Sequence, residues 1–123
     1  MILLDTNYLI NVLVSGKAEA EQVRLWYPDE DLCTSSVSWY EFICGPVDSA
    51  GILVVRSLLH DRILPFTADQ ATESARLFNA TGRMRRLRVD AMIAAAAIVA
   101  NATLATANTA DFAVFRQFGL RLQ

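Results

Sequence analysis

The chain opens with Met1-Ile2-Leu3-Leu4-Asp5-Thr6-Asn7, a short apolar run that ends at an acid and two small polar residues. We predict a buried strand over residues 1–4 that stops at Asp5, because an unbroken aliphatic run is typical of a strand covered on both faces. Four further segments have the same character. We predict strands at residues 32–34, 63–66, 103–106 and 120–122.

Helical segments separate these strands. We predict helices at residues 9–14 and 17–27, from the cap Ser35-Ser36 to near Gly45, at 51–60, from the cap Thr67 or Asp69 through Asn79, and at 89–102 and 109–118. Short apolar strands that alternate with helices indicate a parallel sheet with helices on both faces, joined by right-handed crossovers. The expected fold class is therefore α/β, and ligands of such folds bind beyond the carboxyl ends of the strands.

Length and composition predict one domain over residues 1–123, since the chain has 123 residues of which 54% are hydrophobic and 20% charged. The longest apolar run, Ala91–Ala100, is shorter than the roughly 20 residues of a membrane helix. Asp5 falls inside what would be the apolar part of a signal peptide, and Cys33 and Cys44 are too few for a disulfide framework. We therefore expect a cytoplasmic protein without a membrane partner.

Four acids stand near the predicted strand ends, each bracketed by apolar sequence. Asp5 follows the first strand, and Glu41 lies in the first turns of the helix after the second. Asp90 opens a long apolar helix, and Asp111 follows the strand at 103–106 by a short loop. Four converging carboxylates repel one another unless a divalent cation neutralises them. The alternative for Asp5 and Asp90 is that each is only a helix cap or first-turn acid.

The donor set also indicates which cation to expect. All-oxygen ligation favours Mg²⁺, with Mn²⁺ as a substitute. Zinc would require His or Cys ligands, and the chain has one His and two Cys without paired spacing.

Several segments together resemble PIN-domain nucleases. They are Ile2-Leu3-Leu4-Asp5-Thr6-Asn7, Ser35-Ser36-Val37 with Glu41, Asp90-Ala-Met-Ile-Ala-Ala-Ala-Ala97, and Thr106-Ala-Asn108-Thr-Ala-Asp111-Phe112. In size and motif order the chain resembles VapC, the toxin of VapBC toxin–antitoxin modules. The likeness spans almost the whole chain, although residues 45–79 match only in their helical character.

The resemblance implies a PIN-like three-layer α/β/α sandwich around a short, mostly parallel sheet of four to five strands. It implies an Mg²⁺-dependent endoribonuclease whose catalytic residues are Asp5, Glu41, Asp90 and Asp111. Asp5 and Asp90 would bind the metal directly, and the other two directly or through water. The groups expected to orient these carboxylates by hydrogen bonds are Thr6, Asn7, Thr106 and Asn108. We expect metal-activated water to attack the phosphodiester, leaving a 5′-phosphate and a 3′-hydroxyl.

The resemblance also implies macromolecular partners. Family members act on RNA, commonly form homodimers, and are silenced by a VapB antitoxin whose tail lies across the active site. The antitoxin binds operator DNA, so we expect this chain to meet DNA only through that partner.

A cluster of arginines precedes Asp90. The cluster consists of Arg83, Arg85, Arg86 and Arg88, in a chain whose net charge is −2. An acidic protein with one local Arg cluster does not resemble a coating for duplex DNA. The guanidinium fork suits phosphates and carboxylates equally, so we expect contact with RNA or with the antitoxin; the alternative is a solvated face.

Other acidic-pocket enzymes fit the sequence poorly. A phospho-accepting receiver domain and a haloacid-dehalogenase-type phosphatase each need a Lys late in the fold, and the only lysine is Lys17. No Gly-x-x-x-x-Gly-Lys loop is present. Two alternatives stay open: a PIN nuclease that processes RNA without being a toxin, and a PIN-like module that binds RNA or protein without cleaving.

Overall fold

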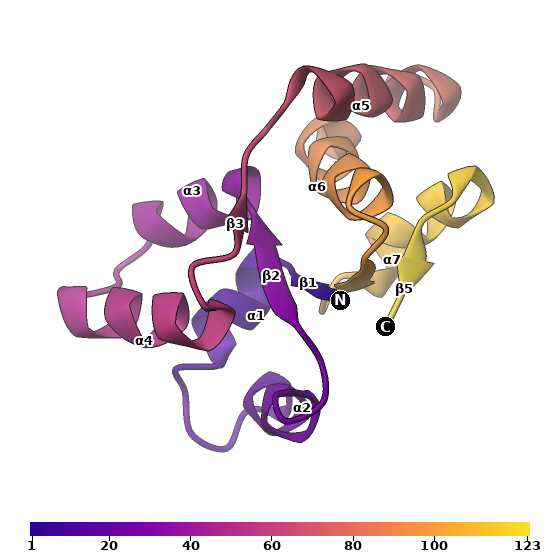
Figure 1. The fold of residues 1–123 in the computed structure, drawn as a ribbon. Helices are drawn as coiled ribbons and strands as arrows, with labels where there is room; N and C mark the ends of the chain where they lie inside the picture. Colours follow the sequence, from indigo (N-terminus) through magenta and orange to yellow (C-terminus); the bar gives the residue numbers. More distant parts are fainter.

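The computed structural model describes residues 1–123 and contains one five-stranded sheet in the order β3-β2-β1-β4-β5 (Figure 1). The strands are β1 (Ile2–Leu4), β2 (Leu32–Ser35), β3 (Ile63–Leu64), β4 (Thr103–Ala105) and β5 (Arg121–Leu122). All four pairings between neighbouring strands are parallel. The α/β class and the short parallel sheet predicted from the sequence are confirmed.

The central strand β1 is the point at which the chain changes direction across the sheet. Leu3 pairs with Cys33 of β2 on one side and with Leu104 of β4 on the other. From β1 the chain moves outward to β2 and β3, and then returns to the opposite side for β4 and β5. Ligands of such sheets bind beyond the carboxyl ends of the strands where the strand order reverses, which here means beyond β1 and β4.

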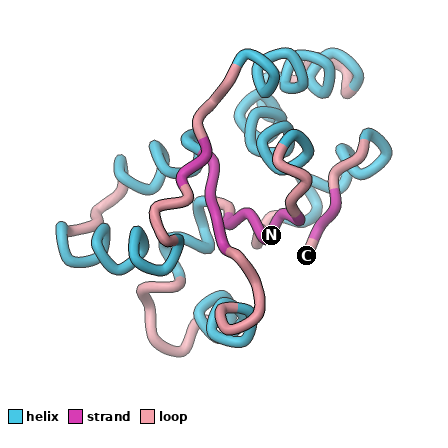
Figure 2. Tube along the Cα trace, in the orientation of Figure 1, coloured by secondary structure: helices cyan, strands magenta, loops and turns pink.

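Helices cover both faces of the sheet (Figures 1 and 2). They are α1 (Thr6–Asn11), α2 (Ala18–Trp26), α3 (Ser36–Cys44), α4 (Ser49–Leu59), α5 (Ala68–Ala80), α6 (Arg88–Val99) and α7 (Thr109–Phe112), with two 3₁₀ helices, η1 (Arg85–Leu87) and η2 (Ala113–Phe118). In the view of Figure 1, α1 to α4 lie on one side and α5 to α7 on the other. None of the helices is both long and apolar enough to cross a membrane.

Each face of the sheet has its own hydrophobic core. Leu3 points into the core that contains the buried alanines of α6 together with Phe112 and Phe115. Its neighbours Ile2 and Leu4 point into the other core, beside residues of α1, α2, α3 and α4. Alternate residues of one strand therefore contact opposite layers, which is the three-layer arrangement.

Some element boundaries differ from those predicted. The first helix begins at Thr6 and not at residue 9, because the Asp5 carboxylate caps it by accepting a hydrogen bond from the Thr6 N–H. The third strand ends at Leu64, and Pro65, which has no N–H to donate, follows it. The predicted helix at 109–118 is divided into α7 and η2. The apolar helix α6 ends at Val99 and turns at Asn101, where φ is +53°.

Candidate active site at the carboxyl ends of β1 and β4

Asp5 lies at the end of β1, and both of its oxygens accept hydrogen bonds. Oδ1 accepts from the Thr6 N–H at 2.7 Å, and Oδ2 accepts from the Thr106 hydroxyl at 2.7 Å. The residue is only 4% exposed. Burial raises the pKa of Asp5, the hydrogen bonds from Thr106 and Thr6 lower it, and the charge of Glu41 raises it further. Asp5 is thus a fixed, buried carboxyl group.

The loop after β4 holds Asp5 in this orientation. The Thr106 Oγ1 atom accepts a hydrogen bond from the Asn108 N–H at 3.0 Å, so its own proton is directed to Asp5. The Asn7 Oδ1 atom accepts from the Ala107 N–H at 3.1 Å. Neither Asn side chain hydrogen-bonds a carboxylate: Asn7 fixes the loop, and Asn108 acts through its backbone.

Glu41 comes to the same region from α3. Its Oε1 atom accepts a hydrogen bond from the Thr6 hydroxyl at 2.7 Å. Thr6 therefore contacts two acids, Asp5 through its backbone and Glu41 through its side chain. The two acids are 36 residues apart in the sequence, and both accept a hydrogen bond from Thr6 at the end of β1.

Ser38 is a polar group at this site that the sequence analysis did not single out. It is fully buried, lies one helical turn before Glu41 on α3, and lowers the pKa of Asp5. The Ser35 hydroxyl, which caps α3, donates to the Ser38 hydroxyl at 3.1 Å. The available signal was spacing, because residues three apart share one face of a helix.

Asp90, in the first turn of α6, is the most perturbed acid of the group. Burial first, and then the charges of Asp5, Asp111 and Glu41, raise the pKa of Asp90 to about 6 from an ordinary value of 3.8; the charge of Arg86 lowers it. All three other predicted acids therefore act on this one carboxyl group. A cation would relieve the repulsion, because it favours the charged form of every member.

Asp111, on α7, pairs with Arg86 of η1. The distance from Arg86 Nη1 to Asp111 Oδ1 is 3.6 Å, and the two side chains are 61% and 52% exposed. The other arginines of the cluster lie differently. Arg83 and Arg88 sit over the ring of Phe78 at 5.6 and 5.4 Å from its centroid, and Arg85 is exposed.

The site is a loose group of acids and not a closed ligand cage. No three His, Cys, Asp or Glu side chains stand close enough together to hold a metal ion as they are placed. The residues nevertheless fit Mg²⁺ or Mn²⁺ in their chemistry, since every charged donor is a carboxylate and Asp90 carries the repulsion of three others. Exposed Glu41 and Asp111 have room to turn toward an ion, whereas Asp5 is already fixed.

A groove of about 450 Å³ runs beside Glu41 between α3 and α6. It is lined by Ser36, Val37, Tyr40, Glu41, Phe66, Val89 and Met92. Tyr40 is 69% exposed there. The groove thus adjoins the acids and offers an aromatic side chain at their margin.

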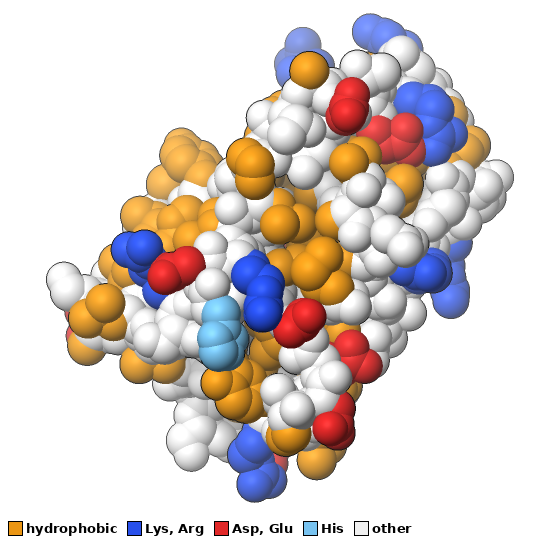
Figure 3. All heavy atoms as spheres, viewed as in Figure 1, with side chains coloured by type: hydrophobic (Ala, Val, Ile, Leu, Met, Phe, Trp, Pro, Cys, Tyr) orange, Lys and Arg blue, Asp and Glu red, His pale blue; other side chains and the backbone are white.

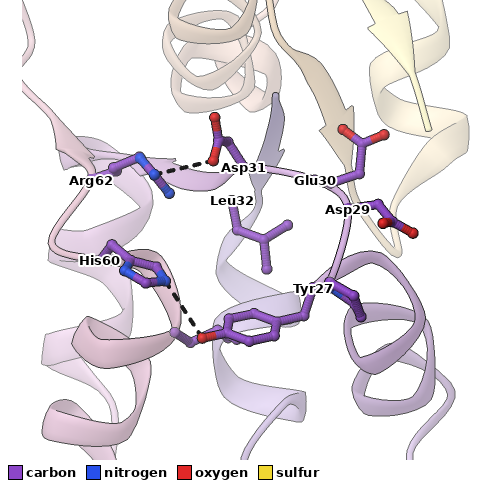
Figure 4. Close-up of a pocket in the computed structure, with 9 residues that line it drawn as sticks. Tyr27, Asp29, Glu30, Asp31, Leu32, His60 and Arg62 are labelled. Carbon is purple, nitrogen blue, oxygen red and sulfur yellow. Dashed lines mark hydrogen bonds and ion pairs between the residues drawn. The ribbon is translucent and has the colours of Figure 1, made fainter.

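A second hollow lies at the opposite, amino end of the strands (Figure 4). There the Tyr27 hydroxyl and His60 Nε2 are 3.5 Å apart, and Arg62 pairs with Asp31 at 3.1 Å. The only His of the chain is therefore remote from the four acids. Figure 3 shows basic and acidic side chains interspersed with apolar ones on this face, without a continuous basic patch.

The comparison with known protein families identifies the fold. The model of the PIN domain matches residues 2–117, so the chain belongs to the PIN domain family. Within that family it is similar to chains of toxin–antitoxin complexes, which confirms the likeness to VapC-type domains. No curated protein matches the chain.

Three solved structures show how similar the chain is to such complexes in sequence identity, coverage and TM-score. A toxin–antitoxin complex from Klebsiella pneumoniae is 32% identical with a TM-score of 0.71, and the match covers 92% of this chain and 91% of that one. VapBC-1 from nontypeable Haemophilus influenzae is 25% identical with a TM-score of 0.68, covering 100% and 97%. DNA-bound VapBC from Salmonella typhimurium shares the fold at 20% identity, with a TM-score of 0.72 and coverage of 99% and 96%.

Proposed function

We propose that the chain is the toxin of a type II toxin–antitoxin system and acts as a metal-dependent endoribonuclease. The observation that carries the proposal is Asp90, whose pKa is raised to about 6 by burial and by the three other acids where the strand order reverses. A perturbed carboxyl group beyond the carboxyl ends of the strands, where the strand order reverses, is typical of a catalytic site. The membership in the PIN family and the likeness to toxin–antitoxin complexes support the same conclusion.

Asp5 and Asp90 are the direct ligands we propose for an Mg²⁺ ion, or for Mn²⁺ in its place. Asp5 is suited to this role because Thr106 and Thr6 fix its oxygens before any ion arrives. Glu41 and Asp111 would complete the site directly or through water. A bound divalent ion lowers the pKa of water and neutralises charge on a phosphoryl group.

The remaining groups position the reactants and receive the proton. Glu41 is exposed and is held by the Thr6 hydroxyl, so its free oxygen can accept a proton from an attacking water molecule. Asp111 is the alternative acceptor, once its pair with Arg86 opens. Because water attacks and the ribose 2′-hydroxyl does not, the products should carry a 5′-phosphate and a 3′-hydroxyl.

The comparisons support an antitoxin as a partner of this chain. The Klebsiella pneumoniae chain comes from a toxin–antitoxin complex, so we propose a VapB-like antitoxin for this chain. The Salmonella typhimurium VapBC complex is bound to DNA, and we propose operator binding through the antitoxin alone. A homodimer, a cytoplasmic location and a single domain over residues 1–123 complete the proposal.

The test is to determine the ends of RNA after expression of the wild type and of Asp5→Asn. We expect new 5′-phosphate ends with the wild type and none with Asp5→Asn. Asp29→Asn is the matched control, since it removes the same charge from an exposed loop at the other end of the strands. Ends bearing a 2′,3′-cyclic phosphate would contradict water attack, and an unchanged RNA population would favour the non-cleaving alternative.

A further inference from the structure

Arg86 is the basic side chain that meets the acids of the site. It pairs with Asp111 at 3.6 Å, and its charge also lowers the pKa of Asp90. The local fold explains this position: η1 ends directly before α6, so Arg86 stands one turn ahead of Asp90 on the same edge of the sheet. One cation is therefore placed beside two of the four carboxylates, Asp111 and Asp90.

None of the neighbouring arginines pairs with an acid of the site. Arg83 and Arg88 both lie over the Phe78 ring, where the aromatic face attracts their charge. Arg85 belongs to the same 3₁₀ helix and is exposed, and it forms no ion pair in the structure. The arginine cluster thus presents one member to the site.

The pair between Arg86 and Asp111 is easily exchanged. At 3.6 Å it is longer than the 2.7–2.9 Å typical of a strong charge-assisted hydrogen bond, and both side chains are more than half exposed. Exposed pairs of this kind contribute little to stability. A guanidinium has five N–H donors, so most of those of Arg86 are free for another anion.

A nucleic acid backbone needs such a cation at this place. Four carboxylates repel a polyanion, and a single divalent ion cancels only half of their charge. Arg86 supplies a further positive charge on the exposed side of Asp111, where a phosphate can approach from solvent. Its planar fork can donate two parallel hydrogen bonds to phosphate oxygens.

We propose that Arg86 is the phosphate-binding residue of the acidic site, which rests on Asp111 in the free protein and moves to a backbone phosphate when RNA enters. This inference rests on the proposed function and adds to it the residue that holds the substrate. It also predicts that Arg86 competes with a divalent ion for Asp111 before RNA binds. Removal of Arg86 should therefore weaken RNA binding and strengthen ion binding, two opposite effects that a structural role would not produce.

The first test measures binding of a labelled single-stranded RNA by fluorescence anisotropy, in an Asp5→Asn background that keeps the RNA intact. We expect Arg86→Gln to raise the Kd about tenfold, as for one lost charge-assisted contact. It should also flatten the slope of log affinity against log salt by about 0.7, the value for one phosphate on a single strand. Arg85→Gln is the matched control and should change neither quantity appreciably. Arg86→Lys should restore the slope.

The second test is calorimetric titration of otherwise wild-type protein with Mn²⁺. Arg86→Gln should bind the ion more tightly, by up to about fivefold, and Arg85→Gln should not. Equal losses of RNA affinity in the two Gln variants, or no loss in Arg86→Gln, would overturn the inference. If the wild type cleaves RNA but Arg86→Gln binds normally, the inference fails and the proposed function stands. If Arg86→Gln weakens binding while the wild type does not cleave RNA, the nuclease function fails and the phosphate contact stands.

Discussion

Asp90→Asn should make the metal-free protein more stable at neutral and alkaline pH. The pKa of Asp90 is raised from 3.8 to about 6, so its charged form is disfavoured in the folded state. At about 1.4 kcal/mol for each pH unit, the full cost of that charge would be about 3 kcal/mol. Asp90 is only partly buried, and solvent screening reduces the expected gain to about 1–2 kcal/mol.

The pH dependence has a definite direction. At pH 4 Asp90 is protonated in the folded state and partly protonated in the unfolded chain, and at lower pH it is protonated in both, so the substitution should change little there. Between about pH 4 and 6 the unfolded chain loses its proton first, so the wild type loses stability relative to the variant. Above pH 6 the difference should be constant.

The assay is urea unfolding in EDTA at pH 4 and pH 8, followed by thermal melting at pH 8. For 123 residues, 1 kcal/mol corresponds to about 4 °C, so Asp90→Asn should raise the Tm by about 4–8 °C. Asp29→Asn, an exposed change of the same charge, should shift it by less than about 2 °C. An Asp90→Asn protein that is less stable than the wild type at pH 8 would refute the reasoning.

Three further predictions concern the groups around the acids. Thr106→Val removes the donor to Asp5 Oδ2 and should cost about 1–3 kcal/mol of unfolding free energy at pH 8, with a tenfold or greater loss of Mn²⁺ affinity by calorimetry; unchanged affinity would contradict it. Because the pKa of Asp90 is about 6, the ion competes with a proton, so Mn²⁺ affinity should fall from pH 7 to pH 5 in the wild type. A flat pH profile would show that Asp90 is not a ligand. Ser38→Ala removes a group that lowers the pKa of Asp5, and should shift the carboxyl titration of Asp5 upward by carbon-detected NMR without unfolding the protein.

The parts of the fold that were predictable depend on local patterns. Apolar runs marked all five strands, and small polar residues before helices marked real caps, as at Ser35 and Thr67. The strand positions in turn placed Asp5 at a carboxyl edge, and the alternation of strands and helices implied that other acids would lie at the same edge.

The parts that were not predictable depend on contacts between distant segments. Thr6 meets Glu41, 35 residues away, and Asn7 meets Ala107, 100 residues away. No periodicity in the sequence distinguishes these partners from other polar residues. The same holds for Phe78. Arg83 and Arg88 lie over its ring, whereas Arg86 pairs with Asp111.

Calorimetric titration with Mn²⁺ at pH 7.5 is the most direct test of a cation site among these acids. The wild type and Asp29→Asn should bind the ion with the same affinity, whereas Asp5→Asn and Asp90→Asn should lose most of the binding. Equal binding in all four proteins, or none in the wild type, would contradict the assignment of these carboxylates.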